Sequence, residues 1–143
     1  MLAATGLGAA TLLAQTNPPT ALDRYVAKPD TNYSYKVVGT NIGTGQTTYI
    51  LDMTSQEWLT TNEVNRTLWK HWLIIVQPDV VTNSQSLLFI SGGSNPGTQP
   101  TSADSNLRQI ALDTGSVVSQ LKMVPNEPLT FVGETNSRTE DSL

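Results

Sequence analysis

The sequence predicts an α/β fold in which an antiparallel hairpin leads into a mostly parallel, buried sheet. Residues 33–38 and 47–54 are strand-like runs with alternating faces, separated by a glycine-containing turn, which is typical of a hairpin. Residues 71–76 and 87–90 are continuous apolar runs without polar alternation, as in strands that are covered on both faces. A helical pattern then separates the second of these runs from a third, which predicts a right-handed parallel crossover.

Length and composition exclude several functional classes. The 143 residues fit one domain, since domains usually hold about 100–200 residues. Eight Lys and Arg stand against twelve Asp and Glu, a net charge of -4, so no basic surface predicts a nucleic-acid partner. The chain has no cysteine and one histidine, which excludes a disulfide framework, a cysteine nucleophile and a thiolate metal site. We therefore expect no metal site and no cofactor.

The first residues have the character of an export signal or its remnant. Residues 2–14 are apolar, small and uncharged, and a polar stretch ending in Pro18 and Pro19 follows. This run is shorter than the ~20 residues that cross a bilayer but matches the ~7–15 residues of a secretory signal core. The usual positive residues before such a core are missing, since Arg24 is the first Lys or Arg. A disordered segment or a core-packing helix is the alternative.

We accordingly expect residues 1–19 to be a signal-peptide remnant and linker, and residues 20–143 to form the domain. No second apolar run is long enough to span a bilayer, so we expect no stable membrane insertion and a secreted or periplasmic location. Two N-glycosylation sequons, which begin at Asn32 and Asn65, are compatible with export.

The N-terminal part of the domain should contain a short helix before the hairpin. Residues 21–26 predict a helical turn that ends at Pro29. Gly43 and Gly45 supply the conformational freedom that the hairpin turn needs. Residues 56–70 are polar and irregular apart from two tryptophans, which predicts a long surface connection.

The C-terminal part should contain one helix between buried strands. Asp104 is the predicted N-cap of this helix, three apolar residues share one of its faces, and Gly115 follows its end. Within about 2–4 residues, the predicted elements are strands over residues 33–38, 47–54, 72–76, 87–90 and 117–121, and a helix over residues 104–113.

The last residues predict another helix. Ser137 and Glu140 have the spacing of a capping box, yet the chain stops at Leu143, and a single helical turn has no stability of its own. An open sheet that ends after the strand over residues 117–121 also leaves an edge unpaired. We therefore expect this chain to be the N-terminal piece of a longer protein.

The strongest candidate site is the glycine-rich loop after residues 87–90. Gly92, Gly93 and Ser94 follow the carboxyl end of a predicted buried strand, where glycine lets backbone N–H groups approach a ligand closely. In serine hydrolases of the α/β type, the loop after the third strand supplies one N–H of the oxyanion hole. The alternative is that the two glycines only form a tight turn between strand and loop.

The rest of a hydrolase site is missing from the sequence. No G-x-S-x-G occurs, and Ser91, Ser94 and Ser116, which have glycine neighbours, do not lie at a sharp turn from strand to helix. In such hydrolases the histidine follows the nucleophile, whereas His71 precedes every glycine-flanked serine. His71 is therefore expected to be a packed or hydrogen-bonded structural residue, and this chain alone is expected to be inactive.

Two further groups of residues have both a functional and a structural interpretation. Asn126 and Glu127 follow the strand over residues 117–121 and should lie at the same sheet end as the glycines, where α/β sheets bind ligands. The alternative, which we favour, is a rigid exposed turn. The three tryptophans, Trp58, Trp69 and Trp72, suit either a ligand shelf or, as we prefer, core and edge packing.

Six segments carry a family resemblance: residues 20–26 (TALDRYV), 68–72 (LWKHW), 88–95 (LFISGGSN), 114–118 (TGSVV), 123–129 (MVPNEPL) and 138–141 (RTED). Together and in this order they resemble the PhoPQ-activated pathogenicity-related protein family, from about residue 20 to the end of the chain. The resemblance implies an exported protein several times longer than this chain, with the three-layer sandwich of an α/β-hydrolase. It also implies that the nucleophile, acid and histidine of a hydrolase lie outside these residues.

The resemblance leaves two functional hypotheses open. Bacterial members of the family are tied to virulence regulation and resistance to cationic peptides, and similar secreted proteins of amoebae act as growth-restraining signals. In the first hypothesis the full-length protein is a secreted serine hydrolase of a small ester or peptide, and Gly93 or Ser94 donates to the oxyanion. In the second, the same fold is a non-catalytic secreted factor that recognises a protein partner or a surface.

Overall fold

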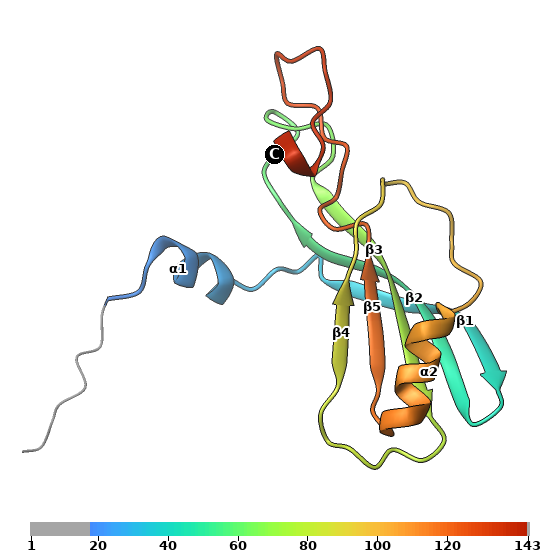
Figure 1. Ribbon diagram of the computed structural model, residues 1–143. Helices are drawn as coiled ribbons and strands as arrows, with labels where there is room; N and C mark the ends of the chain where they lie inside the picture. Colours follow the sequence, from blue (N-terminus) through green and yellow to red (C-terminus); the bar gives the residue numbers. More distant parts are fainter. Residues whose placement is uncertain (1–17, 143) are drawn as a thin grey trace, which may run out of the picture.

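The computed structural model describes residues 18–142, which form a mixed α/β fold with one five-stranded sheet (Figure 1). The predicted export signal over residues 2–14 lies outside the described residues. No helix in the described range is long and apolar enough to cross a membrane. The elements in chain order are α1 (Ala21–Ala27), β1 (Ser34–Gly43), β2 (Gln46–Glu57), β3 (Leu68–Pro78), β4 (Leu87–Ile90), α2 (Ser105–Thr114), β5 (Val118–Lys122) and the 3-10 turn η1 (Glu140–Ser142).

The sheet is mostly antiparallel, which corrects the prediction of a mostly parallel one. Its strand order is β1-β2-β3-β5-β4, and β4 and β5 are its one parallel pair, while β1/β2, β2/β3 and β3/β5 are antiparallel. The physical reason is the connection over residues 79–86, which carries the chain from β3 to β4 without a helix. Two strands of a sheet run parallel only when a crossover of about a dozen residues or more joins them, so β4 reverses direction relative to β3. Because β5 is parallel to β4, it is antiparallel to its other neighbour, β3.

The predicted hairpin and the predicted helix α2 are both confirmed. In the hairpin, Gly43 pairs with Gln46 across a turn in which Gly45 has a φ of 77°, the positive angle that such turns require. At the start of α2 the Asp104 side chain accepts a hydrogen bond from the Asn106 N–H, and Gly115 ends the helix in the left-handed conformation. Local sequence signals therefore determine both elements.

The strands β2 and β3 extend into the segment that was expected to be an irregular connection. Leu68 pairs with Glu57, and Lys70 pairs with Thr54. The prediction of an irregular connection over residues 56–70 is thus wrong at both of its ends. The hydrogen bonds of a sheet join backbone groups, so a strand can continue through residues with polar side chains. A bulge between Thr54 and Gln56 accommodates Ser55 as an extra residue.

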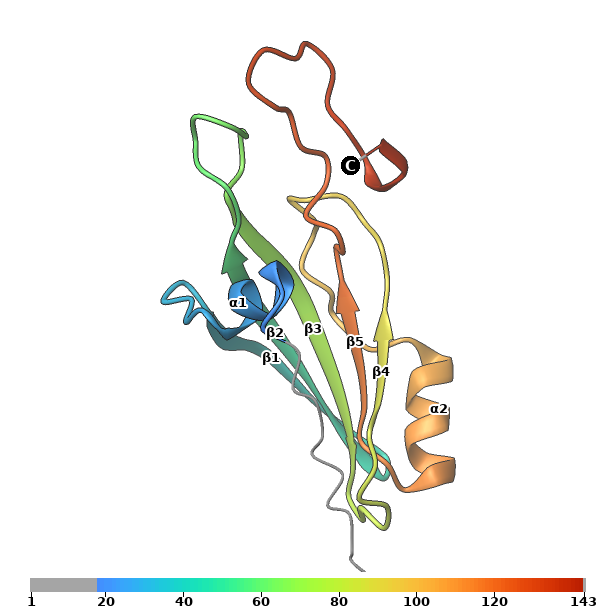
Figure 2. The ribbon, with the colours of Figure 1, turned by 90° about the vertical axis from the view of Figure 1, so that its left-hand side faces the viewer.

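The core lies between α2 and the centre of the sheet, and α2 covers one sheet face (Figure 2). It contains Ile74, Val76, Ala103, Leu107, Ala111 and Val118. The helix α1 begins with a capping box between Thr20 and Asp23 and buries none of its residues. Within residues 18–142, the second helical layer of the expected three-layer sandwich is therefore not observed.

The strand β4 is exposed, although its apolar run predicted burial on both faces. It lies at the sheet edge with β5 as its neighbour, and Leu88 and Ile90 are 52% and 65% exposed. The helix α2 packs on β3 and β5 instead. The exposure of β4 thus follows from its place at the edge of the sheet. The pattern of apolar residues along a strand does not show whether that strand is central or at an edge.

The C-terminal residues also differ from expectation. Ser137 does not cap a helix, because its hydroxyl forms a hydrogen bond of 2.9 Å with Thr130 Oγ1. The turn η1 begins at Glu140, whose N–H donates to Glu127 Oε2 over 2.5 Å. The predicted capping box is therefore not formed. In its place is a short 3-10 turn that is stabilised by a contact with the loop after β5.

Candidate functional site

The candidate site is built at the carboxyl ends of the parallel strands β4 and β5. Residues 91–97 follow β4 and residues 123–128 follow β5, and we call these two segments the loop pair. They leave the same end of the sheet (Figure 1). Met123 N–H donates to Gly92 O and Val124 N–H donates to Ser91 O, each over 3.2 Å, while Asn95 N–H donates to Glu127 O over 2.6 Å. Backbone hydrogen bonds thus join the two loops.

The predicted oxyanion residues lie in the first part of the loop after β4. Gly92, Gly93 and Ser94 are exposed, and within residues 18–142 no backbone or side-chain group accepts a hydrogen bond from their N–H groups. Gly93 has a φ of 124°, an angle that is essentially restricted to glycine. The loop therefore presents three consecutive backbone donors, and the sequence signal that located it was the Gly-Gly pair.

His71 is a buried structural residue, as expected, and it holds one side of the loop pair. His71 is 3% exposed, and its Nδ1 lies 3.0 Å from Met123 O and 3.2 Å from Lys122 O. Because a carbonyl oxygen can only accept, Nδ1 carries a proton, and in the neutral ring Nε2 then accepts from Ser55 Oγ over 2.9 Å. Burial lowers the pKa of His71 below its ordinary value, and the two carbonyl groups oppose this shift in part.

The bonds of His71 reach the glycine loop through Met123. Met123 is buried, and its φ of 64° is a left-handed backbone angle that costs a non-glycine residue about 1–2 kcal/mol. Its carbonyl accepts from His71 while its N–H donates to Gly92 O. His71, Met123 and Gly92 thus form one connected chain of hydrogen bonds from the core to the loop.

Two buried asparagines connect the other side of the loop pair to β3. Asn126 is fully buried, and its Nδ2 donates to Leu68 O over 3.2 Å, while its Oδ1 accepts from Lys70 N–H and from Asn95 Nδ2. Asn95 Nδ2 also donates to Lys70 O over 3.2 Å. The sequence analysis placed Asn126 in a cleft or in an exposed turn, and both placements are wrong. Asn95 belongs to the candidate loop and to the segment 88–95, but its burial was not predicted, because burial of a polar loop residue leaves no periodic signal.

Glu127 and the glycine-flanked serines do not assemble a catalytic group. Glu127 accepts from the Glu140 N–H and so holds η1. Ser91 Oγ donates to Leu121 O and accepts from Gln120 Nε2, each over 3.3 Å. The hydroxyl beside His71 belongs to Ser55, in the β-bulge of β2, and the sequence analysis did not single it out.

The tryptophans are packing residues rather than a ligand shelf. The Trp58 ring lies edge-on to Trp69 at 5.6 Å and to Phe131 at 6.3 Å, and Arg138 stacks on Phe131 at 4.8 Å. Trp72 Nε1 donates to Gly97 O over 3.1 Å and thereby anchors the far end of the glycine loop.

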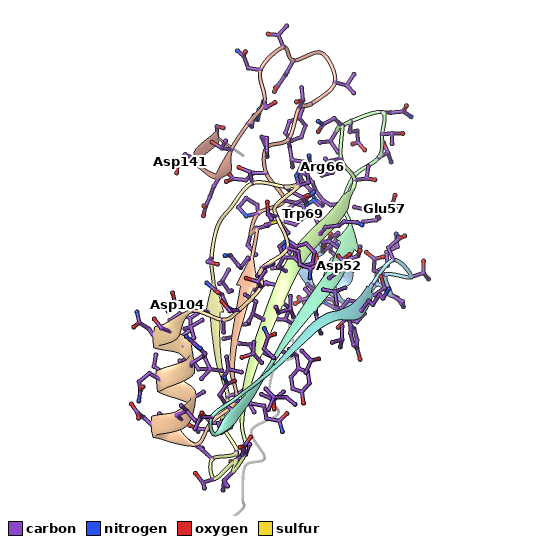
Figure 3. All side chains as sticks on the ribbon, turned by 90° about the vertical axis from the view of Figure 1, so that its right-hand side faces the viewer. Asp52, Glu57, Arg66, Trp69, Asp104 and Asp141 are labelled. Carbon is purple, nitrogen blue, oxygen red and sulfur yellow. The ribbon has the colours of Figure 1, made fainter. Side chains whose placement is uncertain are left out.

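Two buried donors near the start of β3 have no acceptor among the described residues. They are Arg66 Nη1 and Trp69 Nε1, and both side chains lie where the 58–67 loop joins β3 (Figure 3).

A polar groove of about 470 Å³ lies apart from the loop pair. The α1–β1 connection and the end of β2 line it, and the pKa of Asp30 in its wall is lowered by hydrogen bonds from the N–H groups of Glu57 and Asn32. Within residues 18–142 no three His, Cys, Asp or Glu side chains gather as they would around a metal ion.

The fold and the loop pair define a mixed α/β protein with backbone donors at one end of its sheet. The model of the PhoPQ-activated pathogenicity-related protein family matches residues 22–143, so the chain belongs to this family. It is 36% identical to the autocrine proliferation repressor protein A of Dictyostelium discoideum over 125 residues. That match covers 87% of this chain and 25% of the relative, so the chain spans about a quarter of the length of the curated relative.

Among solved structures, the glucuronoyl esterase from Solibacter usitatus is similar to part of the chain. The likeness covers 67% of this chain and 30% of the esterase, with 15% identity and a TM-score of 0.40.

Proposed function

We propose that residues 20–143 are the N-terminal part of an exported α/β-hydrolase-like protein that cleaves a small ester or peptide. In this proposal Gly93 or Ser94 supplies one donor of the oxyanion hole. The observation that carries it is the run of three exposed residues, 92–94, whose N–H groups bond to no other described residue. They lie at the carboxyl end of β4, the end of a strand at which open α/β sheets bind ligands.

The role of these donors follows from the chemistry of acyl transfer. Attack on the scissile carbonyl places a negative charge on its oxygen, and an N–H group aimed at that oxygen stabilises the transition state by about 2.7–4 kcal/mol. The second donor is the N–H after the nucleophile. The nucleophile, acid and base of this proposal belong to the longer protein and not to these residues.

The hydrogen bonds of the loop pair support this role, because oxyanion donors are effective only when they are held in place before reaction. His71 fixes Met123 and, through it, Gly92. Trp72 fixes Gly97 at the other end of the loop. The donors therefore stand on a loop that is anchored on both sides.

The test compares Gly93→Ala with Ser94→Ala in the full-length protein, using p-nitrophenyl esters and peptide anilides as substrates. Alanine disfavours the φ of 124° at residue 93, so the peptide rotates and the N–H groups of residues 93 and 94 move. We expect kcat to fall about 10²–10³-fold with little change in KM, as when an oxyanion donor is lost. Ser94→Ala is the matched control, because it removes a side chain and keeps every N–H.

Equal activity of Gly93→Ala and wild type would contradict the oxyanion role. A folded Gly93→Ala protein, shown by unchanged circular dichroism, is needed for this comparison. Loss of activity in Ser94→Ala to the same extent would also count against it, since the hydroxyl and not the backbone would then be the important group.

A non-catalytic secreted factor on the same fold is the second candidate. The name of the Dictyostelium relative, an autocrine proliferation repressor, favours a signalling role. A serine-reactive fluorophosphonate separates the candidates: the hydrolase is labelled at one serine, whereas the signalling factor is not labelled and still slows proliferation when added to cells of its source.

Export is the third part of the proposal, and it is supported by the apolar, uncharged residues 2–14. Mass spectrometry of the protein from its source should find a processed N-terminus in the medium or the periplasm. An intact Met1 on a cytoplasmic protein contradicts export.

A further inference from the structure

We propose that Asn65, and not Asn32, carries an N-linked glycan. Both residues begin an N-x-S/T sequon, Asn32-Tyr33-Ser34 and Asn65-Arg66-Thr67, the acceptor pattern of N-glycosylation. The inference rests on the export proposed above, because the modifying enzyme acts on chains that enter a secretory pathway. The sequence alone does not separate the two sites, whereas their hydrogen bonds do.

The modification is a group transfer to the amide nitrogen Nδ2. The donor is an oligosaccharide linked to a lipid pyrophosphate. The bond between C1 of its first sugar and the pyrophosphate oxygen breaks, and a bond between Nδ2 and C1 forms. The amide nitrogen loses one proton, and the lipid pyrophosphate is the leaving group. The glycan then extends from Nδ2, so a modified chain keeps its fold only where the folded protein directs this nitrogen to open solvent.

Asn65 meets this requirement. It is exposed on the loop between β2 and β3, and its Oδ1 accepts from the Thr130 N–H over 2.9 Å. Its own N–H donates to Thr130 O over 3.0 Å. The oxygen side of the amide is thereby held against the protein, and Nδ2 makes no hydrogen bond to any residue between 18 and 142.

Asn32 does not meet it. Its Nδ2 donates to Glu57 Oε2 over 3.0 Å, and its backbone N–H donates to Asp30 Oδ1 over 2.8 Å. The side chain is half-buried in the wall of the 470 Å³ groove. A sugar at this nitrogen would be crowded by the Glu57 carboxylate, so modification opposes the folded arrangement.

The test expresses the 143-residue chain behind a heterologous cleavable signal in a eukaryotic secretory host. The added signal makes entry independent of the native export signal, so failure of glycosylation and failure of native export are separate results. Peptide N-glycosidase removes the glycan and leaves aspartate at the attachment position, which peptide mass spectrometry locates. We expect one glycan, at Asn65.

Variants of the third sequon residue keep the two asparagines and their bonds intact. Thr67→Ala should abolish the glycan, and Thr67→Ser should retain it. Ser34→Ala, which destroys the sequon at Asn32, should leave the glycan unchanged. The Thr67 and Ser34 hydroxyls form no hydrogen bond with another described residue, so loss of folding is not the expected effect of any of these changes.

An unmodified wild-type chain that has entered the secretory pathway would overturn the proposal. A glycan that persists in Thr67→Ala, or that occupies Asn32, would overturn it as well.

Discussion

At the residue scale, His71 connects three strands through its ring. It lies on β3, accepts from Ser55 of β2 through Nε2 and donates through Nδ1 to carbonyl groups at the end of β5. Burial of the ring favours its neutral form, with the proton on Nδ1, and the two carbonyl groups oppose this preference only in part. The unfolded chain has no such preference, so the protonation state of His71 contributes to stability.

Stability should therefore fall as the pH drops below about 6.5, the ordinary pKa of an unfolded histidine. The folded pKa is lowered by burial, so over this window the unfolded state binds a proton that the folded state does not, and unfolding becomes easier. Urea unfolding from pH 7 to pH 5 measures the effect. In His71→Gln the slope over this window should disappear, at the cost of about 1–3 kcal/mol at pH 7 for buried groups left unpaired. An unchanged slope contradicts this role of His71.

Ser55 and His71 lie at the distance of a nucleophile and its base, yet we expect no reactivity from this pair in the isolated chain. The imidazole is almost fully buried, and the exposed N–H donors belong to residues 92–94, on the loop after β4. A fluorophosphonate probe should leave the 143-residue chain unlabelled. Stoichiometric labelling that is lost in both Ser55→Ala and His71→Gln would show that the pair is a working catalytic dyad.

At the element scale, the C-terminus of α2 depends on one glycine. Gly115 has a φ of 61°, and a Cβ at this position would lie 2.1 Å from Thr82 Oγ1. Its carbonyl accepts from the N–H groups of Thr82 and Asn83. The glycine therefore ends α2 and also holds the connection between β3 and β4.

Gly115→Ala should destabilise the fold more than Gly133→Ala does. Gly133 also has a positive φ, of 89°, but a Cβ there meets nothing within 4 Å. Backbone strain alone costs about 1 kcal/mol, so we expect about that loss for Gly133→Ala and about 2–3 kcal/mol for Gly115→Ala, where a clash adds to it. Chemical denaturation of the two variants measures the difference, and equal losses would contradict the argument.

At the scale of the whole molecule, β4 gives the sheet an apolar edge. All four of its residues are large hydrophobics, and all four are exposed. It has neither the charges nor the prolines by which soluble proteins usually protect an edge strand. The opposite edge, β1, differs in composition, because it includes Lys36 and several polar residues.

We expect the isolated chain to self-associate through β4. Sedimentation at increasing concentration should show association that Leu88→Lys reduces, since a buried charge in the new contact is costly. Ile42→Lys is the matched control, because Ile42 is an even more exposed residue of the other edge strand. A chain that is monomeric at all concentrations, or equal effects of the two lysines, contradicts this prediction.

Local sequence patterns were sufficient for the type and approximate place of the main elements. Turn glycines predicted the hairpin, and Asp104 and Gly115 predicted the ends of α2. These signals act within a few residues and therefore need no knowledge of the fold. The same holds for the Gly-Gly pair of the candidate site, whose special backbone angle is a property of glycine.

The sequence by itself thus determined the family, the order of helices and strands, and the loop at the end of β4. The tertiary structure alone decided the antiparallel direction of β3, the exposure of β4 and the network of His71, Asn95 and Asn126. The physical reason is distance along the chain. Strand direction, burial and buried polar contacts depend on distant partners, which in the polar network lie from 16 to 58 residues away. No local periodicity specifies which partner is present.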